Sequence, residues 1–157
     1  MFGILERLTV LKIVVMTAEQ IALVKKSWKV FRDIDPVLIG DVFYSKLFLE
    51  VPHVKHLFKT SREVQSKKLI DMLSVIVGRL DRLDEITEDI QQLAIRHVRY
   101  GARPEHYKAI GRTLIWTLKQ GLGVDWTLEL ENAWISCYQT LSDTMIKAAN
   151  YKSQSMT

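Results

Sequence analysis

Residues Glu88–Gly101 read EDIQQLAIRHVRYG, and in this segment an apolar stripe ends on a histidine. Steps of four, three and four residues place four side chains on one helical face: Ile86, Ile90, Leu93 and His97. The first three are apolar and favour burial. The imidazole of His97 is therefore either satisfied within the core, as most buried polar groups are, or turned inward to bind a ligand.

The length and composition of the chain indicate one folded domain. The chain has 157 residues, of which 48% are hydrophobic and 25% charged, and this composition argues against disorder. A chain of this length can bury a core large enough to enclose a cofactor. The formal net charge of +4 is too small to indicate nucleic-acid binding by itself, and zinc-finger spacing is absent. We expect a compact protein that does not bind nucleic acid.

The ends of the chain differ from its centre. Residues 1–15 are too short and too charged for a transmembrane helix, which needs about 20 apolar residues, and they lack the features of a secretory signal. Thr17 and Gln20 then form a capping-box pattern that resembles a second beginning. We expect an N-terminal extension over 1–15, a globular domain over 16–150 and a flexible tail over 151–157. The single cysteine, Cys137, fits a reducing compartment, so we expect a cytoplasmic protein.

The repeating patterns along the chain are helical. Asp35–Pro36 and Pro104–Glu105 are typical of helix N-termini, where proline is tolerated and an acidic residue is favourable. No alternating strand pattern of useful length and no internal repeat is present in the sequence. The expected fold class is therefore all-α, with helices over 18–33, 36–50, a short one to 57, 64–80, 84–100, 104–121 and 127–149.

A second polar residue mirrors His97. Gln65 begins the apolar stripe of the helix expected over 64–80. Two apolar helices that each turn one nitrogen-bearing side chain inward suit a flat hydrophobic prosthetic group with a central metal. A core that simply satisfies both side chains remains the alternative. Tyr44 would need a hydrogen-bond partner if buried, and Tyr107 lies on the next helix, from which it could reach back toward His97.

The other polar patterns in the sequence give weaker evidence of a functional site. His53 and His56 lack a third ligand near them in sequence, so we assign them no metal. The row of Arg96, Arg99 and Arg103 is either a solvated face or a surface for anionic cofactor groups or an acidic electron donor. The sequence contains no P-loop, dinucleotide fingerprint, catalytic triad pattern or paired catalytic carboxylates, which argues against a hydrolase, a kinase or a self-contained dehydrogenase.

Taken together and in order, several segments resemble the globin family. They include FYSKLFLEVPHVKHLF, QSKKLIDMLSVIV, RHVRYGARPEHYKAIGRTL and ENAWISCYQTLSDTMI, and the resemblance extends over residues 17–149. The combination is similar to single-domain bacterial haemoglobins related to the globin part of flavohaemoglobins. This resemblance implies a globin fold, a helical sandwich around a haem pocket.

The resemblance also implies a set of haem contacts. Haem b (iron protoporphyrin IX) would lie between the fourth and fifth helices, with His97 as the iron ligand. Phe58 would stack on the porphyrin, and Lys68 would reach a propionate. The other contacts that it implies are Leu93, Ala102, Tyr107 and Ile110 on the proximal side, and Tyr44, Gln65 and Leu69 on the distal side.

The function that the resemblance implies is the binding of diatomic gases and their reaction at a haem iron. An iron with imidazole on one face keeps a position open for O2, NO or CO, and Tyr44 and Gln65 would donate hydrogen bonds to O2 as the catalytic pair. NO dioxygenation would need an external reductase, because this chain has no room for flavin and nicotinamide domains. The alternatives are non-enzymatic O2 storage or transport and a haem-based sensor module. We expect a monomer or weak homo-oligomer. One position departs from flavohaemoglobins: Ala149 stands near where they carry a glutamate.

Overall fold

The computed structural model describes residues 16–155, with side chains as far as residue 149. The expected extension, residues 1–15, lies outside the described residues. Every element in the described range is helical, which confirms the all-α prediction. In chain order the elements are α2 Ala18–Phe31, α3 Pro36–Glu50, η1 Pro52–Leu57, α4 Arg62–Gly78, η2 Leu80–Ile86, α5 Thr87–Arg99, α6 Pro104–Leu122, η3 Gly123–Asp125 and α7 Leu128–Ser155.

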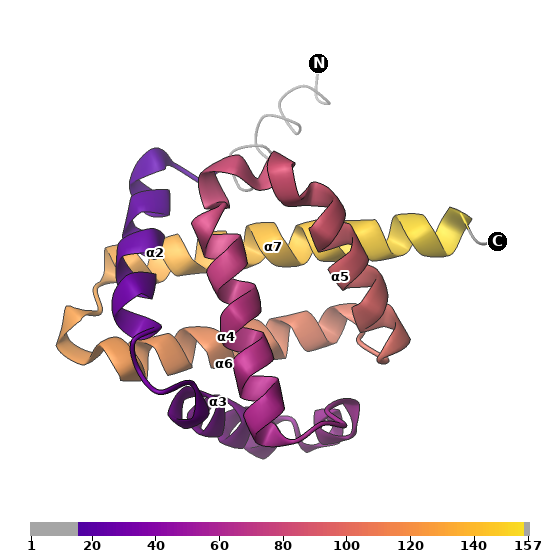
Figure 1. Ribbon diagram of the computed structural model, residues 1–157, viewed down its shortest axis with the longest axis horizontal. Helices are drawn as coiled ribbons and strands as arrows, with labels where there is room; N and C mark the ends of the chain where they lie inside the picture. Colours follow the sequence, from indigo (N-terminus) through magenta and orange to yellow (C-terminus); the bar gives the residue numbers. More distant parts are fainter. Residues whose placement is uncertain (1–15, 156–157) are drawn as a thin grey trace.

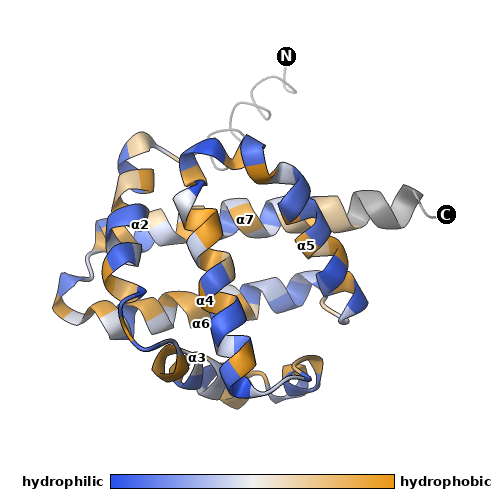
Figure 2. Ribbon diagram, viewed as in Figure 1, coloured by the Kyte–Doolittle hydropathy of each residue, from blue (hydrophilic) through white to orange (hydrophobic). Residues whose placement is uncertain are grey.

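The helices form two crossing layers. In Figure 1, α6 and α7 run across the view next to each other, and α2, α4 and α5 cross them. Helix α3 packs on both α4 and α6, whereas α5 packs chiefly on α7. Figure 2 shows apolar and polar residues mixed along each helix, as expected when amphipathic helices bury one face. Within residues 16–155, no helix is both long and apolar enough to cross a bilayer.

The first two described helices begin at the N-terminal capping residues that the sequence predicts. The Thr17 hydroxyl accepts from the Gln20 backbone N–H at 3.1 Å, and the Gln20 side chain accepts from the Thr17 N–H at 3.0 Å, so the predicted capping box is present. Asp35 accepts from the Val37 N–H at 3.0 Å, and Pro36 begins α3. These contacts satisfy N–H groups that have no partner inside the helix.

Two predicted helix boundaries are wrong. The helix expected over 84–100 begins at Thr87 as α5, because residues 84–86 belong to the 3-10 segment η2, in which the backbone at Arg82 is non-helical (φ −141°, ψ 44°). The Thr87 hydroxyl donates to the carbonyls of Leu83 and Asp84 at this junction, a local contact that competes with regular helix. Helix α7 continues to Ser155, past its expected end at residue 149.

The core consists of two hydrophobic clusters. The larger one joins α2, α3, α4, α6 and α7 around Trp28 and Trp134, whose rings lie 5.9 Å apart. Both indole N–H groups are satisfied, since Trp28 donates to Ser74 at 3.1 Å and Trp134 donates to Ser27 at 2.9 Å. The smaller cluster joins α5 to α7 and to the end of α4 through seven buried residues: Ile76, Ile86, Ile90, Ala94, Leu141, Met145 and Ala148.

The crossing of α3 and α4 depends on a glycine. A Cβ added at Gly40 would lie 1.6 Å from the Ser66 hydroxyl and 3.2 Å from the Ser66 Cα, so the two backbones approach as closely as they do only because Gly40 has no side chain. Tyr44 lies one helical turn beyond Gly40, and Gln65 precedes Ser66. This contact therefore sets the distance between Tyr44 and Gln65 as well as the helix crossing.

Gly40→Ala tests this contact. We expect the substitution to lower the free energy of unfolding by about 1–3 kcal/mol, the usual effect of overpacking, because α3 and α4 must separate. Gly78→Ala is the matched control, since a Cβ there meets no atom within 4 Å and alanine suits a helix better than glycine. Urea denaturation of both variants measures the effect. Equal stability of the two variants would show that the close approach is not needed.

Candidate functional site

His97 lies near the end of α5, at the edge of its buried face. Ile86 and Ile90 are buried as the stripe predicted. Leu93 and His97, however, are only half-buried. The fully buried position is Ala94, with 0% of its surface exposed, because the face that packs on α7 continues through this residue. The helix thus leaves His97 beside the smaller hydrophobic cluster instead of enclosing it.

One hydrogen bond orients the imidazole. His97 Nδ1 lies 2.8 Å from the Leu93 carbonyl oxygen, which can only accept, so Nδ1 carries the proton and Nε2 keeps its lone pair. Burial lowers the pKa of His97, the charge of Arg96 adds to this effect, and the Leu93 contact opposes it. The imidazole is therefore neutral at pH 7. A neutral imidazole whose other nitrogen donates to a carbonyl is the usual state of a metal-binding histidine.

Tyr44 lies across the fold in the larger cluster. Its side chain is 3% exposed, and its hydroxyl donates to the Gln65 backbone carbonyl at 3.3 Å. Its ring meets Phe58 edge-on, with centroids 5.3 Å apart, and lies 5.8 Å from Phe48. Burial raises the pKa of Tyr44 above its ordinary value, so the phenol stays protonated and able to donate at any physiological pH.

The Gln65 amide has a different partner from the one that its pairing with Tyr44 suggests. Gln65 Nε2 donates to the Thr60 hydroxyl in the loop before α4, and only the backbone of Gln65 contacts Tyr44. Lys68 is exposed on α4. Leu69 is half-buried and packs on the larger cluster, as do Phe58 and Ile110.

The remaining predicted proximal residues lie around the loop after α5. The Ala102 N–H donates to the His97 carbonyl at 2.9 Å, which ties the loop to the end of the helix. Tyr107 is half-buried and packs on the smaller cluster, as Leu93 and Ala149 also do. Within the described residues, Tyr107 makes no hydrogen bond to His97; its carbonyl accepts one from the Tyr138 hydroxyl.

Sequence reasoning missed two residues that shape this region. Thr60 holds the Gln65 amide, and its hydroxyl five positions before Gln65 was the available signal. Met72 packs against both hydrophobic clusters, although on the stripe of α4 it is indistinguishable from an ordinary core residue. Both roles depend on contacts that sequence spacing alone does not specify.

The arrangement fits a haem. Of the residues expected on its proximal side, Leu93 and Tyr107 pack on the smaller cluster and Ile110 packs on the larger one. Phe58, expected to stack on the porphyrin, and Leu69, expected on the distal side, also pack on the larger cluster. These five side chains are half-buried and so leave apolar surface that a flat hydrophobic group can cover. His97 adds a neutral nitrogen donor with a free lone pair, as an iron ligand requires.

Comparisons with known proteins agree with this fit. A flavohemoprotein of Vibrio cholerae is 29% identical over 136 residues, which cover 83% of this chain and 34% of that protein. The chain thus spans about a third of the length of the flavohemoproteins it matches. A globin-like protein of Aquifex aeolicus is 33% identical over 103 residues, which cover 66% of this chain and 73% of that protein.

Solved structures share the fold. An engineered carbene transferase from Rhodothermus marinus has a TM-score of 0.81 at 23% identity, covering 90% of this chain and 99% of that one. A bacterial globin from Campylobacter jejuni has a TM-score of 0.77 at 22% identity, covering 88% and 99%. The Globin family model matches residues 41–145, more than half of the chain. The chain therefore belongs to the globin family, whose members bind haem and, through it, diatomic gases.

Proposed function

We propose that this chain holds one haem b between α4 and α5, with His97 Nε2 as the iron ligand, and binds O2, NO and CO reversibly. The observation that carries the proposal is the 2.8 Å contact between His97 Nδ1 and the Leu93 carbonyl, which leaves Nε2 free. When bound, the haem supplies an iron with one position open to a diatomic gas. Lys68, which is exposed on α4, would contact a haem propionate.

Tyr44 gives the pocket its selectivity. Its phenol is protonated, buried and held by a single long hydrogen bond of 3.3 Å to the Gln65 carbonyl, so it can turn to a polar gas at little cost. O2 accepts a hydrogen bond more strongly than CO does, and in a dry pocket such a bond is stronger than in water. Gln65 serves as a second donor once its amide releases Thr60.

With a supply of electrons, the same pocket would convert NO to nitrate. The reaction combines NO, O2 and one electron to give nitrate, and the Rhodothermus marinus protein that shares this fold is described as a putative nitric oxide dioxygenase, which supports this proposal. The electron would come from an external reductase. Arg96, Arg99 and Arg103 are exposed and form no ion pair with another described residue, so they offer a docking surface to an acidic partner.

One observation favours simple O2 binding as a second candidate. The His97 side chain is hydrogen-bonded to a backbone carbonyl, and Ala149, near the position where flavohaemoglobins carry a glutamate, packs on the same small cluster as Tyr107. A neutral carbonyl makes the imidazole a weaker electron donor than a carboxylate does. Storage or transport of O2 requires no such electron donation.

His97→Ala tests the ligand assignment. We expect the variant to lose the Soret spectrum of the wild-type haem complex, and added imidazole to restore a spectrum close to it by occupying the vacated space. His56→Ala is the control, since His56 is exposed on η1. An unchanged spectrum in His97→Ala would refute the assignment.

Tyr44→Phe tests the selectivity of the pocket. The substitution removes the hydroxyl and keeps the ring that packs on Phe58. We expect O2 dissociation to accelerate about 10- to 100-fold, the range for a hydrogen bond of 1.5–3 kcal/mol to a charged group, while CO dissociation changes little. Stopped-flow experiments measure the O2 and CO dissociation rates. Tyr100→Phe is the control, because Tyr100 is 59% exposed. Equal acceleration for both gases would contradict this role.

Reversing the charge of the arginine row tests the docking surface. In a variant with glutamate at 96, 99 and 103, haem reduction by an acidic flavoprotein reductase should slow roughly tenfold at low ionic strength, and the difference should disappear at high salt. Stopped-flow reduction measures both conditions.

The matched control carries the same change in charge on α2 and at its C-cap, at three exposed basic positions with similar spacing: Lys26, Lys29 and Arg32. Because α2 and α5 lie on opposite sides of the fold (Figure 1), this control should leave the reduction rate near that of the wild type. Equal slowing of both variants would indicate a general effect of net charge and exclude a specific docking surface.

A further inference from the structure

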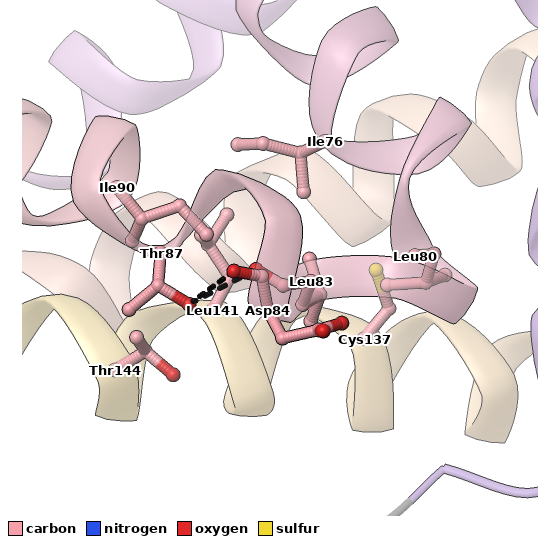
Figure 3. Close-up of a pocket in the computed structure, with 9 residues that line it drawn as sticks. All are labelled: Ile76, Leu80, Leu83, Asp84, Thr87, Ile90, Cys137, Leu141 and Thr144. Atoms are coloured by element: carbon pink, nitrogen blue, oxygen red, sulfur yellow. Dashed lines mark hydrogen bonds between the residues drawn. The ribbon is translucent and has the colours of Figure 1, made fainter.

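A second cavity lies away from the proposed haem site. It has a volume of about 270 Å³ and opens between η2, the first turn of α5, the end of α4 and the middle of α7 (Figure 3). None of the residues proposed to contact haem lines it. Its lining consists of Ile76, Leu80, Leu83, Asp84, Thr87, Ile90, Cys137, Leu141 and Thr144.

The interior of this cavity is apolar. Isoleucine and leucine side chains from four elements form most of its wall. The polar group on the floor is the Cys137 thiol, which is buried, and burial raises the pKa of Cys137 to about 12, so the thiol is uncharged. An apolar interior of this kind is suited to a hydrocarbon group and gives few partners to water.

The rim of the cavity offers acceptors and no free hydroxyl donor. The Thr87 hydroxyl donates to the carbonyls of Leu83 at 3.1 Å and Asp84 at 3.3 Å, and the Thr144 hydroxyl donates to the Thr140 carbonyl at 2.7 Å. Each threonine therefore presents only lone pairs to a ligand. Asp84 is exposed at the rim, and no ion pair involves it among the described residues.

We propose that this cavity binds a short aliphatic or aromatic ammonium ion, with the hydrocarbon part inside and the charged head at Asp84. The acceptor-only rim matches an ammonium group, which carries donors and no acceptor, and it repels a carboxylate of the same length. If a water-sized group takes about 30 Å³, the cavity accommodates roughly six to eight non-hydrogen atoms with normal packing gaps. The ligand is therefore about the size of hexylamine.

Three probes of equal chain length test the proposal: n-hexylamine, n-hexanol and n-hexanoate. The haem-loaded protein is kept under CO, which prevents the amine from reaching the iron, and binding is followed at pH 7 by chemical-shift changes of the Cys137 and Thr144 amides. We expect hexylamine to bind most tightly, hexanol more weakly and hexanoate weakest. Tighter binding of hexanoate than of hexylamine, equal binding of all three, or no binding of any would overturn the proposal.

Two variants distinguish the contribution of the ligand's ammonium group from that of its hydrocarbon part. Asp84→Asn should weaken hexylamine roughly two- to fivefold, as expected for loss of a partly exposed ion pair, and leave hexanol unchanged. Asp89→Asn is the matched control, because Asp89 is exposed on α5 outside the cavity. Ile90→Ala enlarges the cavity, so it should change the affinity for hexylamine and for hexanol alike. If Asp84→Asn and Asp89→Asn weaken hexylamine equally, Asp84 does not bind the head group.

Discussion

Helix α5 must meet two demands at once, and the site depends on both. Ile90 and Ala94 bury one face of the helix against α7 and so hold it to the rest of the fold. His97, three residues after Ala94, has to stay half-buried with its Nε2 free. The hydrogen bond between His97 Nδ1 and the Leu93 carbonyl meets both requirements. It orients the ring through the backbone of α5 itself, so no second side chain is needed.

The opposite side of the proposed pocket is set by the packing of α3 on α4. The missing side chain at Gly40 lets the two backbones meet at Ser66, and one turn later this brings the Tyr44 hydroxyl to the Gln65 carbonyl. Tyr44 is then enclosed by Phe48 and Phe58. A packing contact between two helices thus places a buried hydrogen-bond donor in the pocket that we propose for gas binding.

Sequence reasoning succeeded where the determining interaction is local or periodic. The Thr17 cap, the Pro36 start and the stripe leading to His97 all depend on residues within one or two helical turns. It did not predict that residues 84–86 lie in the 3-10 segment η2, or that the Gln65 amide donates to Thr60 in this structure. The second cavity was likewise not predictable, because its walls come from four elements that meet only in the folded chain.

The site proposed above requires that one haem binds between α4 and α5 through a single histidine. The absorption spectrum of the purified protein, titrated with haem and then reduced, measures this binding. We expect saturation at one haem per chain and a ferrous spectrum typical of five-coordinate iron, converted to a six-coordinate spectrum by CO. Absence of a Soret band after reconstitution, or a ferrous spectrum already six-coordinate without added gas, would contradict it.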